Sequence, residues 1–478
     1  MTAVALTPNW RWDASPLSVD TLRPPPTPPL EWAYLAAGSL GGSLHVVDAY
    51  ATDATAAAAA EQAMAHDPAV VVLSTAPSLL YWRCPPFSVH APRTATEALR
   101  NAGYDGDILL VGPHGTHSPR WALDAIGATA AWRGSSDVRL GEMLDNGSWR
   151  HSKYVAAEGR LGAVCVDAAA DLPIARHEIY PVADYRPHMW TVDHAEALAA
   201  GALARGALAE ASRGCPWSCF YCAKGPVRDN YGRRPAERVI AELGQLANEG
   251  FDYVFFVDET FNIAGDELGT VTAALRGLGL KFGFQGRPDL ISPAAAEDLA
   301  TAGCVYVELG VDLINDGDSK AASRRQRRAA AEAGLEACRN TIPIVRYNRL
   351  NAETLDYRKL FPSEGGLDWA VPADPIYPYP GAPMAMPLMA MYGRSSFDWE
   401  FAERYSWWLR LEVALQRRGV RDPQIVSDLK DAFLAMPRPA AAAVAALSED
   451  AKAWPGLHES NKAVSGVGGE LDLPRSGA

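Results

Sequence analysis

The sequence predicts an α/β protein with an N-terminal doubly wound parallel sheet, then a partial (β/α)6 barrel, and then a helical C-terminal region. Three observations support this prediction. Apolar runs of strand length alternate with helix-like stretches in two separate parts of the chain, 31–150 and 206–385. The strand-like runs are rich in valine and leucine, as expected of parallel strands that are buried on both faces. From about residue 386 only helical periodicity continues.

The composition narrows the class of function. With 48% hydrophobic and 21% charged residues, the 478-residue chain is able to bury two or three cores. Its net charge of −13 disfavours general binding to nucleic acid or to anionic membranes. We find no run of about 18 apolar residues and no secretory signal. Seven cysteines, an odd number, indicate a reducing cytoplasm rather than a disulfide framework. We therefore expect a cytoplasmic protein that acts on a small molecule.

The N-terminal part reads as an open parallel sheet preceded by an extended segment. Residues 1–30 end in the Pro-rich stretch 23–29, which predicts an extended lead-in rather than a helix or a central strand. The domain itself is predicted over 31–150, and 151–205 is predicted to be a linker. Its expected strands are 44–50, 69–76 and 107–114, and its expected helices are Ala54–Ala65 and Arg93–Ala102. Ligands of such sheets bind beyond the carboxyl ends of the strands.

The second part, 206–385, repeats a strand and a helix in six steps of barrel type. The expected strands are 207–214, 253–259, 281–287, 305–311, 342–348 and 369–375, and the expected helices are Pro235–Gly250, 265–277, 293–302 and 321–339. A site is expected at the C-terminal ends of these strands. The helical region, with helices at Trp399–Arg418 and Gln424–Leu434, is predicted over 386–455, and the polar segment 456–478 is predicted to be a tail.

Three of the seven cysteines lie within eight residues, directly after the first barrel strand. Cys215, Cys219 and Cys222 have the spacing Cys-x3-Cys-x2-Cys, with which a single loop can wrap three corners of a cubane iron–sulfur cluster. Three ligands for four irons leave one iron open, and that iron can chelate the amino and carboxylate groups of S-adenosylmethionine (SAM). The alternatives are a structural zinc site, a disulfide or coincidence. A closed zinc site needs a fourth ligand, and no Cys or His stands nearby.

This segment resembles the signature of the radical SAM superfamily, and the resemblance extends to other strand ends. It implies a [4Fe-4S] cluster, SAM as a bound cofactor, and a reductant such as flavodoxin or ferredoxin. It places Tyr221 near the adenine of SAM, and Glu259 in a motif that binds its amino group. Gln285 and Arg287 end the third strand, where polar groups point into the barrel. Glu308 and Asp312 end the fourth strand near the SAM ribose and carboxylate. The alternative for each acidic residue is a solvated loop.

The N-terminal part resembles the cobalamin-binding class of radical SAM enzymes, and the likeness covers about residues 1–390. The motifs that carry it are 7–10, 74–78, 81–85 and 111–114, and they make Ser74, Trp82 and Gly112 candidate cofactor-binding residues. Two features depart from the class. The Asp-x-His-x-x-Gly motif is absent, and Arg133–Asp137 stands where an Arg-Gly-Glu-Gly-Glu-like turn is common. The domain therefore either binds cobalamin without a His ligand or keeps the fold alone.

Several N-terminal residues have two interpretations each. His114 and His117 are either cobalt ligands or solvated loop residues. The aromatic pair Tyr81 and Trp82, together with Cys84, either supports a planar corrin or fills a packing patch between domains.

Three functions are compatible with the sequence. The first is cobalamin-assisted transfer of a methyl group from SAM to a small molecule in specialised-metabolite biosynthesis. The second follows from a resemblance to the radical SAM enzymes of arsinothricin biosynthesis, and is transfer of the 3-amino-3-carboxypropyl group of SAM to trivalent arsenic. For it, Cys84, Cys304 and Cys338 are either thiols that bind arsenic or inert buried residues. The third is a non-enzymatic corrinoid or iron–sulfur carrier.

Overall fold

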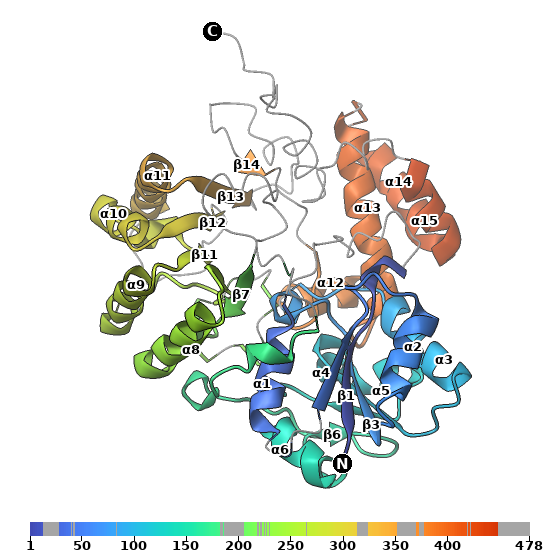
Figure 1. Ribbon diagram of the computed structural model, residues 1–478. Coiled ribbons are helices and arrows are strands. Elements are labelled where there is room, and N and C mark those ends of the chain that lie inside the picture. The colour runs from blue at the N-terminus through green and yellow to red at the C-terminus, as the bar shows by residue number, and fades with distance from the viewer. Residues whose placement is uncertain are drawn as a thin grey trace.

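The computed structural model describes two parallel sheets and a C-terminal group of helices (Figure 1). The residues that it describes are 1–12, 28–39, 41, 44–82, 84–181, 185, 205–217, 219, 222–223, 225, 227–228, 230–263, 265–312, 324–350, 370–371, 377–417, 419–420 and 422–447. The predicted fold class is confirmed. In this part of the chain, no helix is long and apolar enough to cross a membrane.

The first sheet has six strands in the order β2-β1-β3-β4-β5-β6. They are β1 (Ala3–Thr7), β2 (Leu44–Asp48), β3 (Val70–Ser74), β4 (Asp107–Val111), β5 (Ala130–Trp132) and β6 (Val155–Ala156). Neighbouring strands are parallel except for β6, which runs antiparallel to β5. The order of the first five strands is that of a doubly wound fold, in which the chain changes direction between β1 and β3.

Helices cover both faces of the first sheet. They are α1 (Leu30–Gly38), α2 (Ala56–Met64), α3 (His90–Asn101), α4 (Pro113–His117), α5 (Pro119–Ile126) and α6 (Arg139–Asn146). Residues of α2, α3 and α5 share one apolar core with one face of the strands. Residues of α1 and α6 share a second core with the other face. This division explains why Val and Leu recur without polar alternation in β3 and β4.

Two predicted boundaries differ from the structure. β1 lies inside the predicted lead-in, where it pairs with both β2 and β3. Its sequence, AVALT, is short and rich in alanine, so the strong strand signal of its neighbours is missing, but its place between two strands buries all five residues. The first unit also extends beyond residue 150, because β6 adds an edge strand and Gly134 bridges Cys165. Most of the Pro-rich stretch lies outside the described residues.

The second sheet has six parallel strands in the order β14-β13-β12-β11-β10-β7. They are β7 (Gly206–Ala209), β10 (Tyr253–Phe256), β11 (Lys281–Gly286), β12 (Cys304–Asp312), β13 (Ile344–Leu350) and β14 (Ala370–Val371). Sequential order along the whole sheet is the arrangement of a partial barrel, and the predicted (β/α)6 unit is confirmed.

Four helices form an arc outside this sheet, at the left of Figure 1. They are α8 (Ala236–Asn248), α9 (Asp266–Leu278), α10 (Pro293–Thr301) and α11 (Arg324–Thr341). Local signals fix their ends: the Ser292 side chain caps α10 by accepting from Ala295 N–H, and Gly279 ends α9 in the left-handed region. Their apolar residues pack with the outer face of the strands in one core.

The inner face of the barrel sheet packs against the first unit. Leu208, Phe255 and Tyr306 of the strands share a core with Tyr34 of α1 and with Trp82, which follows β3. The carboxyl ends of the two sheets are thereby brought to the same part of the molecule.

A third layer comes from the C-terminal helices α12 (Ala385–Met391), α13 (Trp399–Arg417), α14 (Pro423–Ala435) and α15 (Arg438–Leu447). Their core is aromatic and includes the fully buried Trp407 and Trp408. It reaches the first unit through Phe87, which stacks on Tyr379 with ring centroids 5.2 Å apart.

Candidate active site

The three clustered cysteines lie on one loop, closed at its base by two short strands. β8 (Ser212–Arg213) pairs antiparallel with β9 (Gly232–Arg233), and we call residues 214–231 between them the cysteine loop. Cys215 N–H donates to the carbonyl of Arg228 at 3.3 Å, and Cys222 N–H donates to the carbonyl of Cys219 at 3.2 Å. All three cysteines are partly exposed. Tyr221 lies outside the described residues.

The donor set of the loop fits a cubane cluster, because soft thiolates are the ligands of iron–sulfur clusters. A closed zinc site needs four ligands, and the loop contains three cysteines and no histidine. In a cubane each thiolate binds a different iron, so the thiols need only surround the cluster. Three partly exposed thiols spread along one loop meet that requirement.

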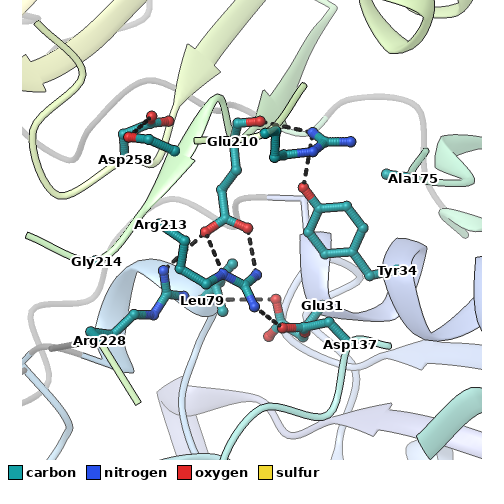
Figure 2. Close-up of polar contacts among 12 residues, drawn as sticks. Glu31, Tyr34, Leu79, Asp137, Ala175, Glu210, Arg213, Gly214, Arg228 and Asp258 are labelled. Atoms are coloured by element: carbon teal, nitrogen blue, oxygen red, sulfur yellow. Dashed lines mark hydrogen bonds and ion pairs between the residues drawn. The ribbon is translucent and has the colours of Figure 1, made fainter. Parts of the chain in front are cut away.

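A buried network of charges holds the two ends of the cysteine loop together, and we call Glu210, Arg213, Arg228 and Glu259 the clamp. Figure 2 shows Glu210 between Arg213 and Arg228. Glu210, directly after β7, accepts from Arg213 Nε at 3.1 Å and from Nη2 at 2.6 Å. Arg228 Nη1, at the other end of the loop, lies 2.9 Å from Glu210 Oε1 and 3.1 Å from Glu259 Oε1. The clamp thus joins the loop's entry, its exit and the strand before it.

Glu210 remains a carboxylate although it is completely buried. Burial by itself raises the pKa of a carboxyl group, but the guanidinium groups of Arg213 and Arg228 lower the pKa of Glu210 to about 2. Arg213 is equally buried, and Glu210 and Asp137 raise its pKa above the ordinary arginine value despite the desolvation. Glu210 and Arg213 are therefore a pair of fixed opposite charges.

Gly214 carries the chain from the clamp to the first cysteine. Its φ of 81° lies in the left-handed region, and a Cβ at this position would lie 2.2 Å from the carbonyl oxygen of Asn230. Its N–H donates to Glu259 Oε2 at 2.8 Å. Both oxygens of Glu259 thus bind protein groups, one the backbone of Gly214 and the other Arg228. Its predicted contact with the SAM amino group stays a prediction.

Asp258, next to Glu259, fixes the chain where it passes from β7 into β8. It accepts from Ala211 N–H at 3.0 Å and from the Ser212 hydroxyl at 2.6 Å. Burial raises the pKa of Asp258 to about 7. The two adjacent carboxyl groups thus hold successive parts of the chain that leads into the cysteine loop.

Two predicted site residues of the barrel, Gln285 and Glu308, share one face of the sheet. Gln285 of β11 is the register partner of Glu308 of β12, two residues beyond the pair Gly283 and Tyr306. Tyr306 belongs to the inner core, so alternation along the strand places Glu308 at an inner position as well. The Tyr306 hydroxyl donates to Glu308 Oε2 at 3.1 Å, and Glu308 is 7% exposed.

Arg287 connects the end of the third barrel strand with the cysteine loop. Its guanidinium binds both carboxylate oxygens of Asp289, at 2.9 and 2.8 Å. It also lies 4.5 Å from the ring centroid of Trp217, which stands between Cys215 and Cys219. Arg287 is therefore a fixed positive charge beside the loop that carries the thiols.

The candidate cofactor residues of the first unit lie at the carboxyl edge of its sheet. The Ser74 hydroxyl donates to the Ala76 carbonyl at 2.7 Å, so it stabilises its own turn. Gly112 has a φ of 116°, and a Cβ on it would lie 2.5 Å from Thr75 Oγ1. Glycine here lets the turns after β3 and β4 approach each other, close to the change of direction between β1 and β3.

Trp82 and His114 both lie in buried surroundings. Trp82 packs in the core between the two units, and its predicted contact with a cofactor stays a prediction. His114 is fully buried, with its ring centroid 4.2 Å from that of Trp399 in α13. Burial lowers the pKa of His114 to about 3, so the ring is neutral and covered rather than solvated. Burial also lowers the pKa of His117, to about 4.

Sequence reasoning did not identify Glu31, a buried acid at the same edge of the first sheet. It lies in the first turn of α1 and accepts from Leu79 N–H at 3.2 Å (Figure 2). Burial, together with the nearby carboxylate of Asp137, raises the pKa of Glu31 to about 8. Glu31 is therefore a neutral acid below about pH 8.

Glu31→Gln is expected to remove a pH-dependent loss of stability. Because the folded pKa of about 8 lies above the ordinary 4.5, the stability that protonated Glu31 contributes is complete below pH 4.5 and is lost as pH rises through 8. At about 1.4 kcal/mol per unit, that loss is at most about 5 kcal/mol. Chemical unfolding at pH 5, 7 and 9 measures it. The variant should be the more stable protein at pH 9, while Glu61→Gln on the exposed face of α2 should follow wild type.

Of the clamp, only Glu259 was among the predicted site residues; Glu210, Arg213, Arg228 and Asp137 were not. The available signal was charge next to an apolar strand, because Glu210 and Arg213 closely follow the buried strand β7. Buried charges of this kind are paired in native proteins. Glu210 and Arg213 pair with each other, but their further partners Arg228 and Asp137 stand 18 and 76 residues away in the sequence.

Comparisons with known proteins cover both units. Residues 210–358 match the family model of the radical SAM superfamily. A 60-residue segment is 40% identical to the ribosomal protein uS12 methylthiotransferase RimO of Kineococcus radiotolerans, and the match spans 13% of this chain and 12% of that protein. The match therefore leaves most of the length of RimO uncovered.

Two solved structures share the fold over most of this chain. The radical SAM methyltransferase TsrM of Kitasatospora setae, with tryptophan and a SAM analogue bound, has a TM-score of 0.57 at 16% identity, over 82% of this chain and 76% of its own. The cobalamin-dependent SAM radical enzyme OxsB, with aqua-cobalamin and SAM bound, has a TM-score of 0.57 at 12% identity, over 97% of this chain and 74% of its own.

Proposed function

We propose that this chain, whose barrel is a radical SAM domain, binds a [4Fe-4S] cluster through Cys215, Cys219 and Cys222, and transfers a methyl group from SAM to a small molecule with the help of cobalamin. Two observations together carry the proposal. The three thiols lie on the loop after the first strand of a barrel that matches the superfamily, and the whole chain has the two-unit fold of cobalamin-dependent members.

The cluster and the residues of the chain have separate roles in the proposed reaction. A cluster bound by three thiolates keeps one iron for the SAM amino and carboxylate groups and supplies the electron that breaks a carbon–sulfur bond. The clamp holds the loop that carries the thiols. Gln285 and Glu308 offer polar groups at adjacent inner positions, where they would hydrogen-bond SAM. Arg287 supplies a cation fixed by Asp289 and Trp217 for a carboxylate of SAM or substrate.

The first unit would hold cobalamin at the carboxyl edge of β1, β3 and β4, where doubly wound sheets bind their ligands. Cobalamin supplies a carrier for the methyl group. The turns after β3 and β4, which contain Ser74 and Gly112, would form the wall of this site. His114 is covered by Trp399, so the proposal includes no His ligand to cobalt from this position. A flavodoxin- or ferredoxin-type protein is the proposed electron donor.

The test identifies the adenosine product. The protein is purified without oxygen, reconstituted with iron and sulfide, and given dithionite and SAM, with and without cobalamin and arsenite. Cobalamin-dependent S-adenosylhomocysteine, with or without 5′-deoxyadenosine, is the expected result. 5′-Methylthioadenosine that rises with arsenite and ignores cobalamin would instead indicate 3-amino-3-carboxypropyl transfer. Absence of any adenosine product would indicate a carrier protein and would overturn both enzymatic functions.

Glu308→Ala is expected to weaken SAM binding about tenfold and to leave the cluster's absorbance unchanged. The reason is that Glu308 stands on the inner face opposite Gln285, away from the thiols of the loop. Equilibrium binding of SAM to the reconstituted protein gives the affinity, and the visible spectrum gives the cluster content. Glu237→Ala, at an exposed position on α8, is the control. Equal SAM affinity in both variants would assign Glu308 a structural role only.

A further inference from the structure

One carboxylate of the first unit reaches the cysteine loop. Asp137 follows β5 and accepts from Arg213 Nη1 at 2.6 Å (Figure 2). Both side chains are buried, 4% and 2% exposed, so the contact is an ion pair shielded from water. The same guanidinium binds Glu210, and the next residue but one is Cys215. Asp137 is thus linked to Cys215 through the side chain of Arg213 and the two residues of backbone that follow Arg213.

The segment that carries Asp137 is held firmly by its own unit. The indole N–H of Trp132 donates to the Ser135 carbonyl at 2.7 Å, and Ser135 N–H donates to the Cys165 carbonyl at 2.9 Å. A Cβ on Gly134 would lie 2.0 Å from that same carbonyl, so the two segments are in close contact. Because its own unit holds Asp137 in place, the ion pair with Asp137 restrains Arg213.

Hydrogen bonds also connect this segment with the carboxyl edge of β4. The Thr116 hydroxyl donates to the Gly112 carbonyl at 2.8 Å and accepts from Gly134 N–H at 3.0 Å. A continuous set of contacts therefore runs from the turn after β4, through Asp137 and Arg213, to the entry of the cysteine loop.

We propose that Asp137 is a positioning residue for the cluster, through which the first unit sets the geometry of the cysteine loop by way of Arg213. This rests on the proposed function only in that the loop binds a cluster. Partners that orient the ligands of a metal commonly change affinity or activity 10- to 100-fold when they are removed. Asp137 has this role although it comes from a different unit and lies 78 residues before Cys215 in the sequence.

A second contact between the two units lies at Arg234. Its Nη1 lies 3.4 Å from the Tyr34 hydroxyl and donates to the backbone carbonyl of Glu210 at 2.7 Å, so it holds the backbone after β7 and not the charged side chains of the clamp. Loss of this contact would loosen the barrel as a whole. Loss of Asp137 should loosen the cysteine loop selectively, because Arg213 is a member of the clamp.

The first experiment needs no cluster. Cluster-free protein is treated with iodoacetamide, and the alkylation rates of Cys215 and of the fully buried Cys338 are followed in the same sample by peptide mass spectrometry. Asp137→Asn should raise the Cys215 rate about tenfold relative to Cys338, since a buried charged hydrogen bond of the loop is lost. Asp145→Asn is the matched control. Asp145 also lies in the first unit and accepts from Ser39 Oγ at 2.6 Å and from Gly41 N–H at 2.8 Å.

Asp137→Ala is measured beside Asp137→Asn, because asparagine can still accept a hydrogen bond from Arg213. An unchanged ratio in both variants, or equal acceleration of both cysteines, would overturn the proposal, because the effect would then be absent or global. This readout reports on the loop even if the chain binds no cluster, so the failure of the proposed function would be recognised separately, by missing iron and sulfide in wild type.

The second experiment uses the reconstituted protein. Electron paramagnetic resonance of the reduced cluster is recorded with and without SAM. Asp137→Asn is expected to change the signal of the bound cluster and to lower the rate of SAM cleavage about tenfold, whereas Asp145→Asn should match wild type. Wild-type spectra and turnover in Asp137→Asn would contradict a positioning role.

Discussion

Cys219→Ala is expected to abolish cluster assembly and all cleavage of SAM. The three thiols of the cysteine loop are the only cysteines between residues 166 and 303, so no other cysteine in that stretch can replace the lost ligand. With two thiolates the loop can no longer hold three corners of a cubane. Iron and sulfide content, the visible spectrum and the adenosine product are measured after reconstitution without oxygen.

Cys338→Ala is the control for this variant. Cys338 lies in the outer core of the barrel with the apolar residues of the surrounding helices, and burial raises the pKa of its thiol to about 12. The control should retain the cluster and turn over SAM at the wild-type rate. Normal turnover in Cys219→Ala would remove the basis of the proposed function. Loss of the cluster in both variants would point to general damage.

Glu210→Gln is expected to destabilise the protein by about 3–5 kcal/mol and to reduce cluster content. The change leaves Arg213 and Arg228 buried beside a neutral amide, and breaking one partner of a buried pair has a cost of this size. Since Arg213 directly precedes the cysteine loop and Arg228 lies near its end, the loop should open before the rest of the barrel does. Chemical unfolding gives the free energy, and reconstitution gives the iron bound per chain.

The loss of unfolding free energy in Glu210→Gln depends on pH, and its direction follows from the pKa of Glu210. The folded pKa of Glu210, about 2, is below the ordinary 4.5, so its contribution is complete above pH 4.5 and is lost as pH falls toward 2. The destabilisation of Glu210→Gln should therefore be full at pH 7 and should shrink below pH 4.5. A difference that grows on acidification would contradict the assignment of Glu210 as a buried carboxylate.

Glu242→Gln is the matched control for Glu210→Gln. Glu242 is also fully buried, its pKa is also lowered to about 2 against the effect of burial, and it pairs with Arg234 at 2.9 Å. It lies on α8 rather than at the cysteine loop. The Glu242→Gln variant should lose similar stability but keep its cluster, since the broken pair joins α8 to the segment after β9. Equal loss of cluster in both variants would show that general destabilisation explains the effect.

The parts of the site that the sequence predicted depend on short-range order. The spacing of Cys215, Cys219 and Cys222 places them on one loop whatever surrounds it. The period of two along a strand likewise places Glu308 on the same face as Tyr306, and the parallel register adds Gln285. Patterns of this kind follow from chain geometry over a few residues.

Other features were decided only by packing between distant segments. β1 has a weak strand signal and becomes central because β2 and β3 pair with it on both sides. Trp82 lies in a core between the units, and His114 is covered by Trp399 from a helix that starts 285 residues later. Neither outcome has a signal in the local sequence.

The sequence by itself determined the fold class, the cysteine loop and the inner face of the barrel, because each follows from local spacing and from alternation of apolar residues. The tertiary structure decided which charges meet: Asp137, Glu210, Arg213, Arg228 and Glu259 come from four separate segments. A buried charge must find a partner, but which partner it finds depends on how whole sheets and loops pack together.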